Sequence, residues 1–201
     1  MSNEHSFNRM AFMVTRDPEA KKRQLLDAAL QEFSAHGIAG ARVDQIAKAA
    51  GVSAGLVYTY FGSKDELFAA VFDDIVEGTL SSTPITADDL AEYAGRLFDR
   101  YEAQPEVQRF VNWYRLEGAS TSGLHAASLA SMVEKTAVIQ RAQDAGTVTK
   151  FLSAVDLLGV ILQLSSLWEN ATPEYSSLVA GHTRAERRKV ITDSIAALLR
   201  A

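Results

Sequence analysis

Residues 43–67 read VDQIAKAAGVSAGLVYTYFGSKDEL, and they hold the most informative pattern of the chain. This pattern predicts a short helix over 43–50, a tight turn at Gly51-Val52 and a second short helix over 53–60. Ser53 is a good N-cap for the second helix, and Gly51 permits the positive φ that the turn requires. Two short helices joined in this way form a helix-turn-helix.

The flanking helices are expected to supply the core that a helix-turn-helix cannot form alone. One helix is predicted from Asp17-Pro18 to His36-Gly37, because proline suits a first helical turn and glycine suits a helix end. Another is predicted over 64–77, after Ser63. Apolar residues recur at helical spacing on both: Leu26, Ala29, Leu30 and Phe33 on the first, and Leu67, Phe68, Val71, Phe72 and Ile75 on the second.

The rest of the chain also has helical patterning, without the period-2 alternation of strands. Residues 1–16 read as a flexible arm, and residues 79–86 as a Ser/Thr/Pro linker. Further helices are predicted over 87–103, 106–117, 124–145, 154–170 and 184–200. We therefore expect an all-α fold of about nine helices. An N-terminal three-helix domain would span 17–63 and a C-terminal helical domain 64–201, with helix 64–77 connecting the two.

Composition narrows the class of protein. Of the 201 residues, 47% are hydrophobic and 22% charged, which is typical of a globular chain. The absence of cysteine excludes disulfides, thiolate metal sites and cysteine nucleophiles. The longest apolar stretch, residues 157–167, is too short and too polar to cross a bilayer, and the N-terminus lacks the apolar run of a secretory signal. A cytoplasmic protein is expected.

The charge of the chain is unevenly distributed. The net charge is −5, but residues 1–70 hold eight basic and eight acidic residues, whereas the remainder holds twelve and seventeen. Affinity for phosphate depends on local cations rather than on the total charge. The acidic balance therefore leaves room for nucleic-acid binding by the N-terminal part.

Patterns of catalytic residues are missing from the sequence. The four histidines (His5, His36, His125 and His182) are scattered without metal-ligand spacing, and there is no phosphate-binding glycine loop and no GxSxG motif. Adjacent carboxylates such as Asp73-Asp74 diverge by about 100° on a helix and do not converge on one site. We expect no enzymatic activity, no metal and no cofactor.

The helix-turn-helix segment resembles the DNA-binding domain of the tetracycline-repressor (TetR) family. The resemblance covers residues 20–72, about a quarter of the chain, and the remaining residues fit only as a helical body of suitable length. The matching positions are Val43, Ile46, Ala47, Ala50, Gly51, Val52, Ser53, Gly55, Tyr58, Tyr60, Phe61, Lys64 and Leu67.

The resemblance implies that helix 53–60 lies in the DNA major groove, and that Tyr58, Tyr60 and Lys64 contact phosphates. The small residues Ser53, Ala54 and Gly55 would let the backbone approach base edges closely.

The chain departs from the family pattern at Arg42, where many members have a threonine that caps the next helix. The departure removes the cap and adds a phosphate ligand. Because Ala54 and Gly55 lack side chains for bidentate base contacts, specificity is expected to depend on Arg42, Ser53, Thr59 and DNA shape.

In the TetR family the last two helices pair with those of a second copy. This implies a homodimer that binds a palindromic operator with half-sites one or more helical turns apart. The interface residues would be Leu158, Ile161, Leu162, Ile191, Ile195 and Leu198. The alternative is that these side chains form the core of a single chain.

Polar and aromatic groups mix in the middle of the C-terminal part, as they do in small-molecule sites. The candidates for an effector pocket are Tyr101, Phe110, Trp113, Tyr114, His125, Gln163 and Trp168. The alternative is that these are core or surface residues. By analogy with the family, we expect a dimeric transcriptional repressor that a small molecule releases from its operator. The rival interpretation is a helical protein-interaction adaptor with a helix-turn-helix that no longer binds DNA.

Overall fold

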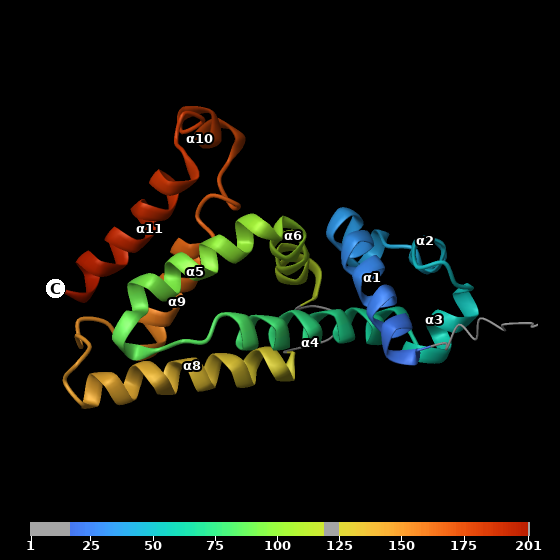
Figure 1. Ribbon diagram of the computed structural model, residues 1–201, viewed down its shortest axis with the longest axis horizontal. Helices are drawn as coiled ribbons and strands as arrows, with labels where there is room; N and C mark the ends of the chain where they lie inside the picture. Colours follow the sequence, from blue (N-terminus) through green and yellow to red (C-terminus); the bar gives the residue numbers. More distant parts are fainter. Residues whose placement is uncertain (1–16, 119–124, 201) are drawn as a thin grey trace, which may run out of the picture.

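One long helix, α4 (Lys64–Ser82), runs from a group of N-terminal helices at one end of the molecule into a helical body (Figure 1). The computed structural model describes residues 17–118 and 125–200. The N-terminal helices are α1 (Pro18–Gly40), α2 (Val43–Ala49) and α3 (Ala54–Phe61). The body contains η1 (Ala87–Asp89), α5 (Leu90–Ala103), α6 (Pro105–Trp113), the π-helical turn η2 (Tyr114–Gly118), α8 (Ala126–Asp144), α9 (Ala154–Ser165), α10 (Pro173–Leu178) and α11 (Arg184–Leu199).

The prediction of an all-α fold with an N-terminal helix-turn-helix is confirmed. The described residues form ten α-helices, and no strand occurs among them. None of these helices is long and apolar enough to cross a membrane. The additional helix is the short α10, which begins at Pro173 and which the sequence patterning did not indicate.

The expected linker over 79–86 is wrong in its first half, because α4 continues to Ser82. The hydroxyl groups of Thr79 and Ser82 donate to the carbonyl oxygens of Ile75 (2.7 Å) and Gly78 (2.6 Å), four residues earlier. Such bonds let serine and threonine remain within a helix. Arg100 of α5 also donates to the Ser82 hydroxyl (2.9 Å), so this end of α4 is anchored to the body.

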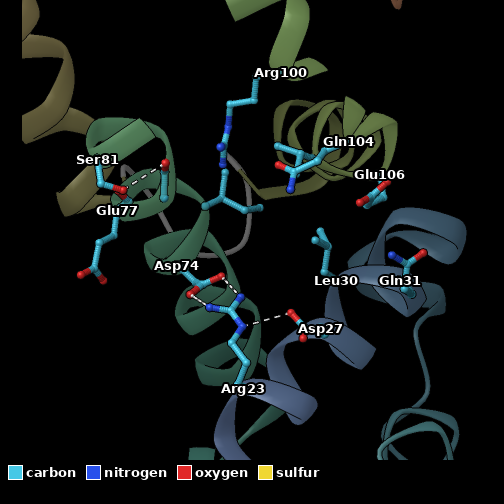
Figure 2. A pocket seen from close by; sticks show the side chains of 13 residues that line it. Arg23, Asp27, Leu30, Gln31, Asp74, Glu77, Ser81, Arg100, Gln104 and Glu106 are labelled. Carbon is cyan, nitrogen blue, oxygen red and sulfur yellow. Dashed lines mark hydrogen bonds and ion pairs between the residues drawn. The ribbon is translucent and has the colours of Figure 1, made fainter. Parts of the chain in front are cut away.

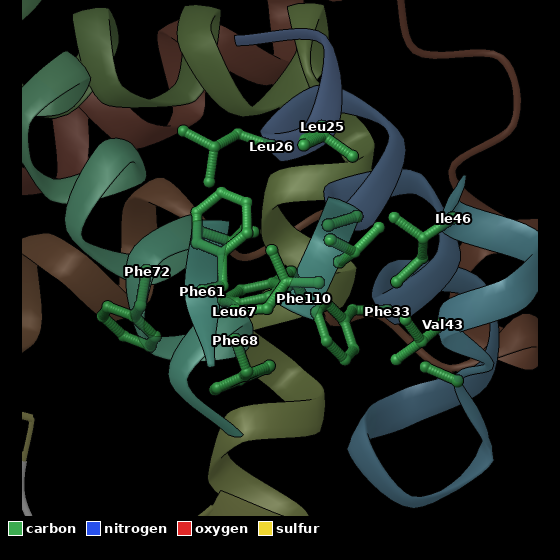
Figure 3. Packing of buried hydrophobic residues seen from close by; sticks show 14 of the residues in the cluster. Leu25, Leu26, Phe33, Val43, Ile46, Phe61, Leu67, Phe68, Phe72 and Phe110 are labelled. Carbon is green, nitrogen blue, oxygen red and sulfur yellow. The ribbon is translucent and has the colours of Figure 1, made fainter. Parts of the chain in front are cut away.

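Two apolar clusters form the interior. The first joins α1, α2 and α3 to α4 and α6, and Figure 3 shows its aromatic centre. The rings of Phe68 and Phe110 stack at a centroid distance of 4.4 Å, and Phe33 meets Phe68 edge-on at 5.2 Å. The N-terminal helices therefore share their core with α4 and α6. The domain boundary at residue 63 stays a prediction.

The second cluster lies within the body, where α5, α8, α9 and α11 pack together. Four of the six residues expected at a dimer interface belong to it and are fully buried: Leu158, Ile161, Ile191 and Ile195. Their apolar helix faces point into the protomer's own core, so the alternative stated above holds for these four. Leu162 and Leu198 are half-buried at the edge of the cluster.

The end of α1 is attached to the body through a kink. The chain turns at Gly37 (φ 72°, ψ −178°) and then continues to Gly40, three residues beyond the expected helix end at Gly37. The carboxylate of Glu117 in η2 accepts hydrogen bonds from the backbone N–H groups of Ile38 and Ala39, both at 2.9 Å. The indole N–H of Trp113 donates to the carbonyl oxygen of Ser34 (3.2 Å). Helix α1 and the segment around η2 are thus directly connected.

Candidate nucleic-acid interface and internal cavity

The turn between α2 and α3 has the geometry that the sequence predicts. Gly51 has a φ of 64°. The backbone N–H of Val52 donates to the carbonyl oxygen of Ala47 (2.9 Å), and that of Gly51 donates to Lys48 (3.2 Å). These two bonds form a Schellman motif, in which glycine is favoured at the left-handed position. They fix the direction in which the chain enters α3.

Helix α3 presents its first turn and one side to the surface. Val57 and Phe61 are buried against α1 and α4, whereas Ser53, Gly55, Tyr58 and Thr59 are exposed. The Ser53 hydroxyl caps the helix by accepting from the backbone N–H of Leu56 (3.3 Å). A Cβ atom added at Gly55 would meet only the Ser53 hydroxyl oxygen, at 4.0 Å. The N-terminal end of α3 is therefore open to a partner.

The two tyrosines of α3 have different environments. Tyr58 is 49% exposed, whereas Tyr60 is half-buried with its ring centre 6.1 Å from that of Phe61. The Thr59 hydroxyl donates to the carbonyl oxygen of Gly55 (2.9 Å), which leaves its oxygen as an acceptor. Of the two tyrosines, Tyr58 is the more exposed.

Arg42 precedes α2, and its side chain makes no capping bond. Its guanidinium instead pairs with the carboxylate of Asp44 (2.9 Å), and both side chains are exposed. The hydrogen bond from Arg42 lowers the pKa of Asp44 below its usual range. Asp44 is therefore ionised at neutral pH and offsets part of the positive charge beside α3.

Lys64, at the start of α4, has a structural role that the sequence did not predict. Its ammonium donates to the carbonyl oxygens of Ala39 (3.2 Å) and Ala41 (3.3 Å), after the kink of α1. An ammonium has three donors, so one remains for a further acceptor. Lys64 also lines a shallow hollow of about 390 Å³ together with Tyr58 and Asp44, between α2 and α3.

The helical body contains a mainly apolar, partly open cavity of about 220 Å³. It lies among α4, α5, α6, η2, α8 and α9. Two of the expected pocket residues, Tyr101 and Gln163, line it. Its wall consists of Phe72, Ile75, Val76, Thr79, Leu97, Tyr101, Val107, Gln108, Val111, Arg115, Ser128, Ser131, Met132, Lys135, Leu162, Gln163 and Ser166.

The other five expected pocket residues lie outside this wall because they are packed elsewhere. Phe110 is in the first apolar cluster, and Trp113 packs against Gly37 of α1. The Tyr114 hydroxyl accepts from the backbone N–H of His125 (3.2 Å), and both rings contact Phe72. Trp168 stacks on Tyr175 of α10. Residue type alone did not separate packing aromatics from cavity-lining ones.

A larger cleft of about 650 Å³ lies between α1, α4 and the α5–α6 corner, and it is polar (Figure 2). Arg23 of α1 pairs with Asp74 of α4 and with Asp27 (3.1 Å) across its floor. These contacts raise the pKa of Arg23, chiefly through its bonds to Asp74. Because Arg23, Asp27 and Asp74 are paired with one another across it, this part of the cleft forms a junction between α1 and α4.

The sequence reasoning missed Lys135 and the contacts that Glu117 makes with α1. Lys135 shares one face of α8 with Ser128, Ser131 and Met132, at spacings of seven, four and three residues. A lysine among cavity-lining positions of one helical face was a usable signal. For Glu117 there was none, since its partners Ile38 and Ala39 are nearly eighty residues away.

A helix-turn-helix exposed at one end, with a helical body that holds a cavity behind it, defines a one-component DNA-binding regulator. The family model "Bacterial regulatory proteins, tetR family" matches residues 25–71, and "Tetracyclin repressor-like, C-terminal domain" matches residues 89–196. The chain belongs to the TetR family of transcriptional regulators, as the resemblance in the helix-turn-helix segment implied. Members of this family bind operator DNA, typically as dimers.

Individual relatives agree with this assignment. The transcriptional repressor SCO4008 of Streptomyces coelicolor is 35% identical over 170 residues, covering 84% of this chain and 88% of its own length. The regulator RutR of Escherichia coli K12 is 40% identical over 111 residues, which is 52% of each chain. The crystal structure of the regulator SCO4942 from Streptomyces coelicolor superposes with a TM-score of 0.79 at 33% identity, covering 89% of this chain and 97% of that one.

Proposed function

We propose that this protein is a dimeric repressor whose operator affinity falls when a small molecule enters the 220 Å³ cavity. One observation carries this proposal. The cavity is bordered by α4 and α6, and the same two helices share the aromatic cluster with α1. A ligand that favours one arrangement of these helices would bias the position of the helix-turn-helix. Since its partner is chromosomal DNA, the expected location is the cytoplasm.

At the DNA, α3 enters the major groove with the small residues Ser53, Ala54 and Gly55 leading. Arg42 and Tyr58 contact phosphates on either side, and Lys64 offers its remaining donor to another. Contacts of this kind set the register of the protein on the duplex, whereas base edges and DNA shape supply the specificity.

We expect Arg42→Ala and Tyr58→Ala each to weaken operator binding about tenfold, with unchanged stability, because both side chains are exposed. Arg42→Ala should also reduce the slope of log affinity against log salt concentration by about one per protomer. Fluorescence anisotropy with promoter DNA from the protein's own locus, over a salt series, measures both effects.

Lys150→Ala is the control for these variants, since Lys150 lies between α8 and α9 at the end of the molecule away from α3 (Figure 1). It should bind the operator as the wild type does. If operator binding survives both Arg42→Ala and Tyr58→Ala, the placement of α3 in the major groove is contradicted. The protein-interaction adaptor would then be favoured.

The dimer is proposed to form through the outer faces of α9 and α11. These faces carry the exposed Val155 and Val190. A Cβ atom added at Gly159 of α9 would meet nothing within 4 Å in the protomer, so a second copy could approach closely there. The two helix-turn-helix units of a dimer held by such an interface would contact the two halves of a palindromic operator.

We expect Gly159→Arg to convert the dimer to a monomer and to weaken operator binding more than a hundredfold, because a single head makes too few contacts. The protomer has room for the new side chain, so its thermal stability as a monomer should be retained. Light scattering after size-exclusion chromatography measures the mass. Val133→Arg, on the exposed side of α8, is the matched comparison. If only that variant is monomeric, the interface lies on α8 and not on α9 and α11.

A further inference from the structure

Lys135 is a buried cation in the wall of the cavity. Only 4% of the residue is exposed. Within the described residues its ammonium has neither a hydrogen-bond partner nor an ion-pair partner. Burial lowers the pKa of Lys135, and the neighbouring Glu134, which is itself exposed, opposes that shift only in part. A partly desolvated ammonium is also costly unless a counter-charge lies beside it.

The charged side chains that line the cavity have one sign. Its wall contains two cations, Lys135 and Arg115, and no carboxylate among the described lining residues. Arg115 is exposed, so it borders the opening, whereas Lys135 lies inside. An anion entering here would meet a cation at the rim and a second one in the interior. A cationic guest would be repelled by both.

Uncharged hydrogen-bonding groups accompany Lys135. Ser131 precedes it by one helical turn on the same face of α8 and is buried. Gln108 of α6 is buried in the same wall. The hydroxyl and the side-chain amide have no bonding partner within the described residues. Both groups can donate to an acidic oxygen.

The other residues that line the cavity determine which ligand structure fits beside the acidic group. Phe72, Ile75, Leu97, Met132 and Leu162 give it an apolar lining. The volume of about 220 Å³ exceeds the roughly 150 Å³ of an apolar protein cavity that accepts benzene. A single aromatic ring or a short alkyl chain with one acidic group fits this space.

We propose that the effector is a small apolar organic acid whose carboxylate pairs with Lys135, while its ring or chain fills the apolar part of the cavity. This inference rests on the proposed function, because it names the ligand class of the same cavity. The acid would supply the counter-charge that Lys135 lacks. It would also contact α4 and α6, the helices through which the ligand is proposed to shift the helix-turn-helix.

Two matched sets of probes test the charge preference. The first is phenylacetate, phenylacetamide and phenethylamine, and the second is octanoate, octanamide and octylamine. Within each set the apolar part is constant and the head group is negative, neutral or positive. Calorimetric titration of the wild-type dimer should show the acid binding at least tenfold more tightly than the amide in at least one set. The amine should bind least.

Lys135→Met tests the residue, since methionine keeps a long unbranched side chain and removes the charge. We expect the acid's advantage over the amide to disappear in this variant, while the amide binds about as before. The variant should be at least as stable as the wild type without ligand, because an unpaired buried charge has been removed. Lys150→Met removes an exposed cation instead and should keep the full preference for the acid.

Operator binding without any probe separates this inference from the proposed function. If the wild type and Lys135→Met bind the operator but neither probe set shows an acid preference, the ligand class is wrong and the regulator remains. The same conclusion follows if Lys135→Met keeps the preference. If the acid binds through Lys135 and leaves operator affinity unchanged, the site is right and the proposed release mechanism fails.

Discussion

Replacing Gly37 with alanine is expected to lower the free energy of unfolding by about 3 kcal/mol and the melting temperature by roughly 6–12 °C. Gly37 has φ 72° and ψ −178°, a region of backbone space that is essentially restricted to glycine. A side chain there is strained even where space is available. Thermal unfolding followed by circular dichroism measures the loss.

There is also no room for a side chain at Gly37. A Cβ atom would lie 2.6 Å from a carboxylate oxygen of Glu117 and 2.8 Å from the Trp113 ring. Both side chains would have to move, and the hydrogen bonds that Glu117 accepts from the backbone N–H groups of Ile38 and Ala39 would be disturbed. Because these contacts attach α1 to the body, the residual folded protein should also respond more weakly to ligand.

Gly40→Ala provides the control three residues later. Its added Cβ would lie 3.5 Å from the Cβ of His36, an ordinary contact, and Gly40 does not have a positive φ. We expect a change within about 0.5 kcal/mol. A Gly37→Ala protein as stable as Gly40→Ala would show that the kink is not held as the structure describes it.

The helix-turn-helix could be predicted from the sequence because its determinants are local. Gly51 and Ser53 specify the turn and the cap within a few residues, and the apolar spacing of α1 and α4 identifies the faces that cover them. The residue types required at these positions follow from a backbone geometry that recurs wherever two short helices meet at a tight turn.

The body was predicted less well because an apolar face does not reveal what it packs against. Ile161 and Ile195 have the spacing of an interface, yet they are buried within the protomer, and the outer faces of the same helices carry Val155 and Val190 instead. Trp113 and Phe110 likewise pack against α1 and α4, segments distant in sequence. Whether an apolar side chain meets its own chain, a partner or a ligand is settled by tertiary structure.

Coupling between cavity and DNA requires a physical connection, and the first apolar cluster provides one. Phe72 of α4 and Val107 of α6 both line the cavity and belong to this cluster. A ligand that separates α4 from α6 by a small distance would therefore change the packing around Phe68 and Phe110, on which α1 rests. Packed cores have discrete arrangements and are not continuously deformable, so small shifts at the cavity can be transmitted to the head.

Truncation of Phe110 to alanine is expected to cost about 3–5 kcal/mol of the free energy of unfolding. Phe110 is 0% exposed, and its ring lies 4.4 Å from that of Phe68, 5.8 Å from Phe72 and 6.2 Å from Phe33. The substitution leaves a cavity at the point where α1, α4 and α6 meet, and the surrounding helices can collapse into it only in part. Urea denaturation measures the loss as a lower midpoint with an unchanged slope.

Phe151→Ala removes the same ring from a side chain that is 64% exposed, between α8 and α9, and should change stability by no more than about 0.5 kcal/mol. The Phe110 variant should have a second defect that this control lacks. At urea concentrations below the denaturation midpoint, the folded Phe110→Ala protein should bind operator DNA more weakly than the wild type. The reason is that α1 and α4 lose the ring against which both pack. A Phe110→Ala protein that is destabilised but keeps wild-type operator affinity and ligand response would show that the aromatic cluster contributes only stability. The cavity would then be connected to the helix-turn-helix by another route. The hydrogen bonds that Glu117 accepts from α1 are the next candidate.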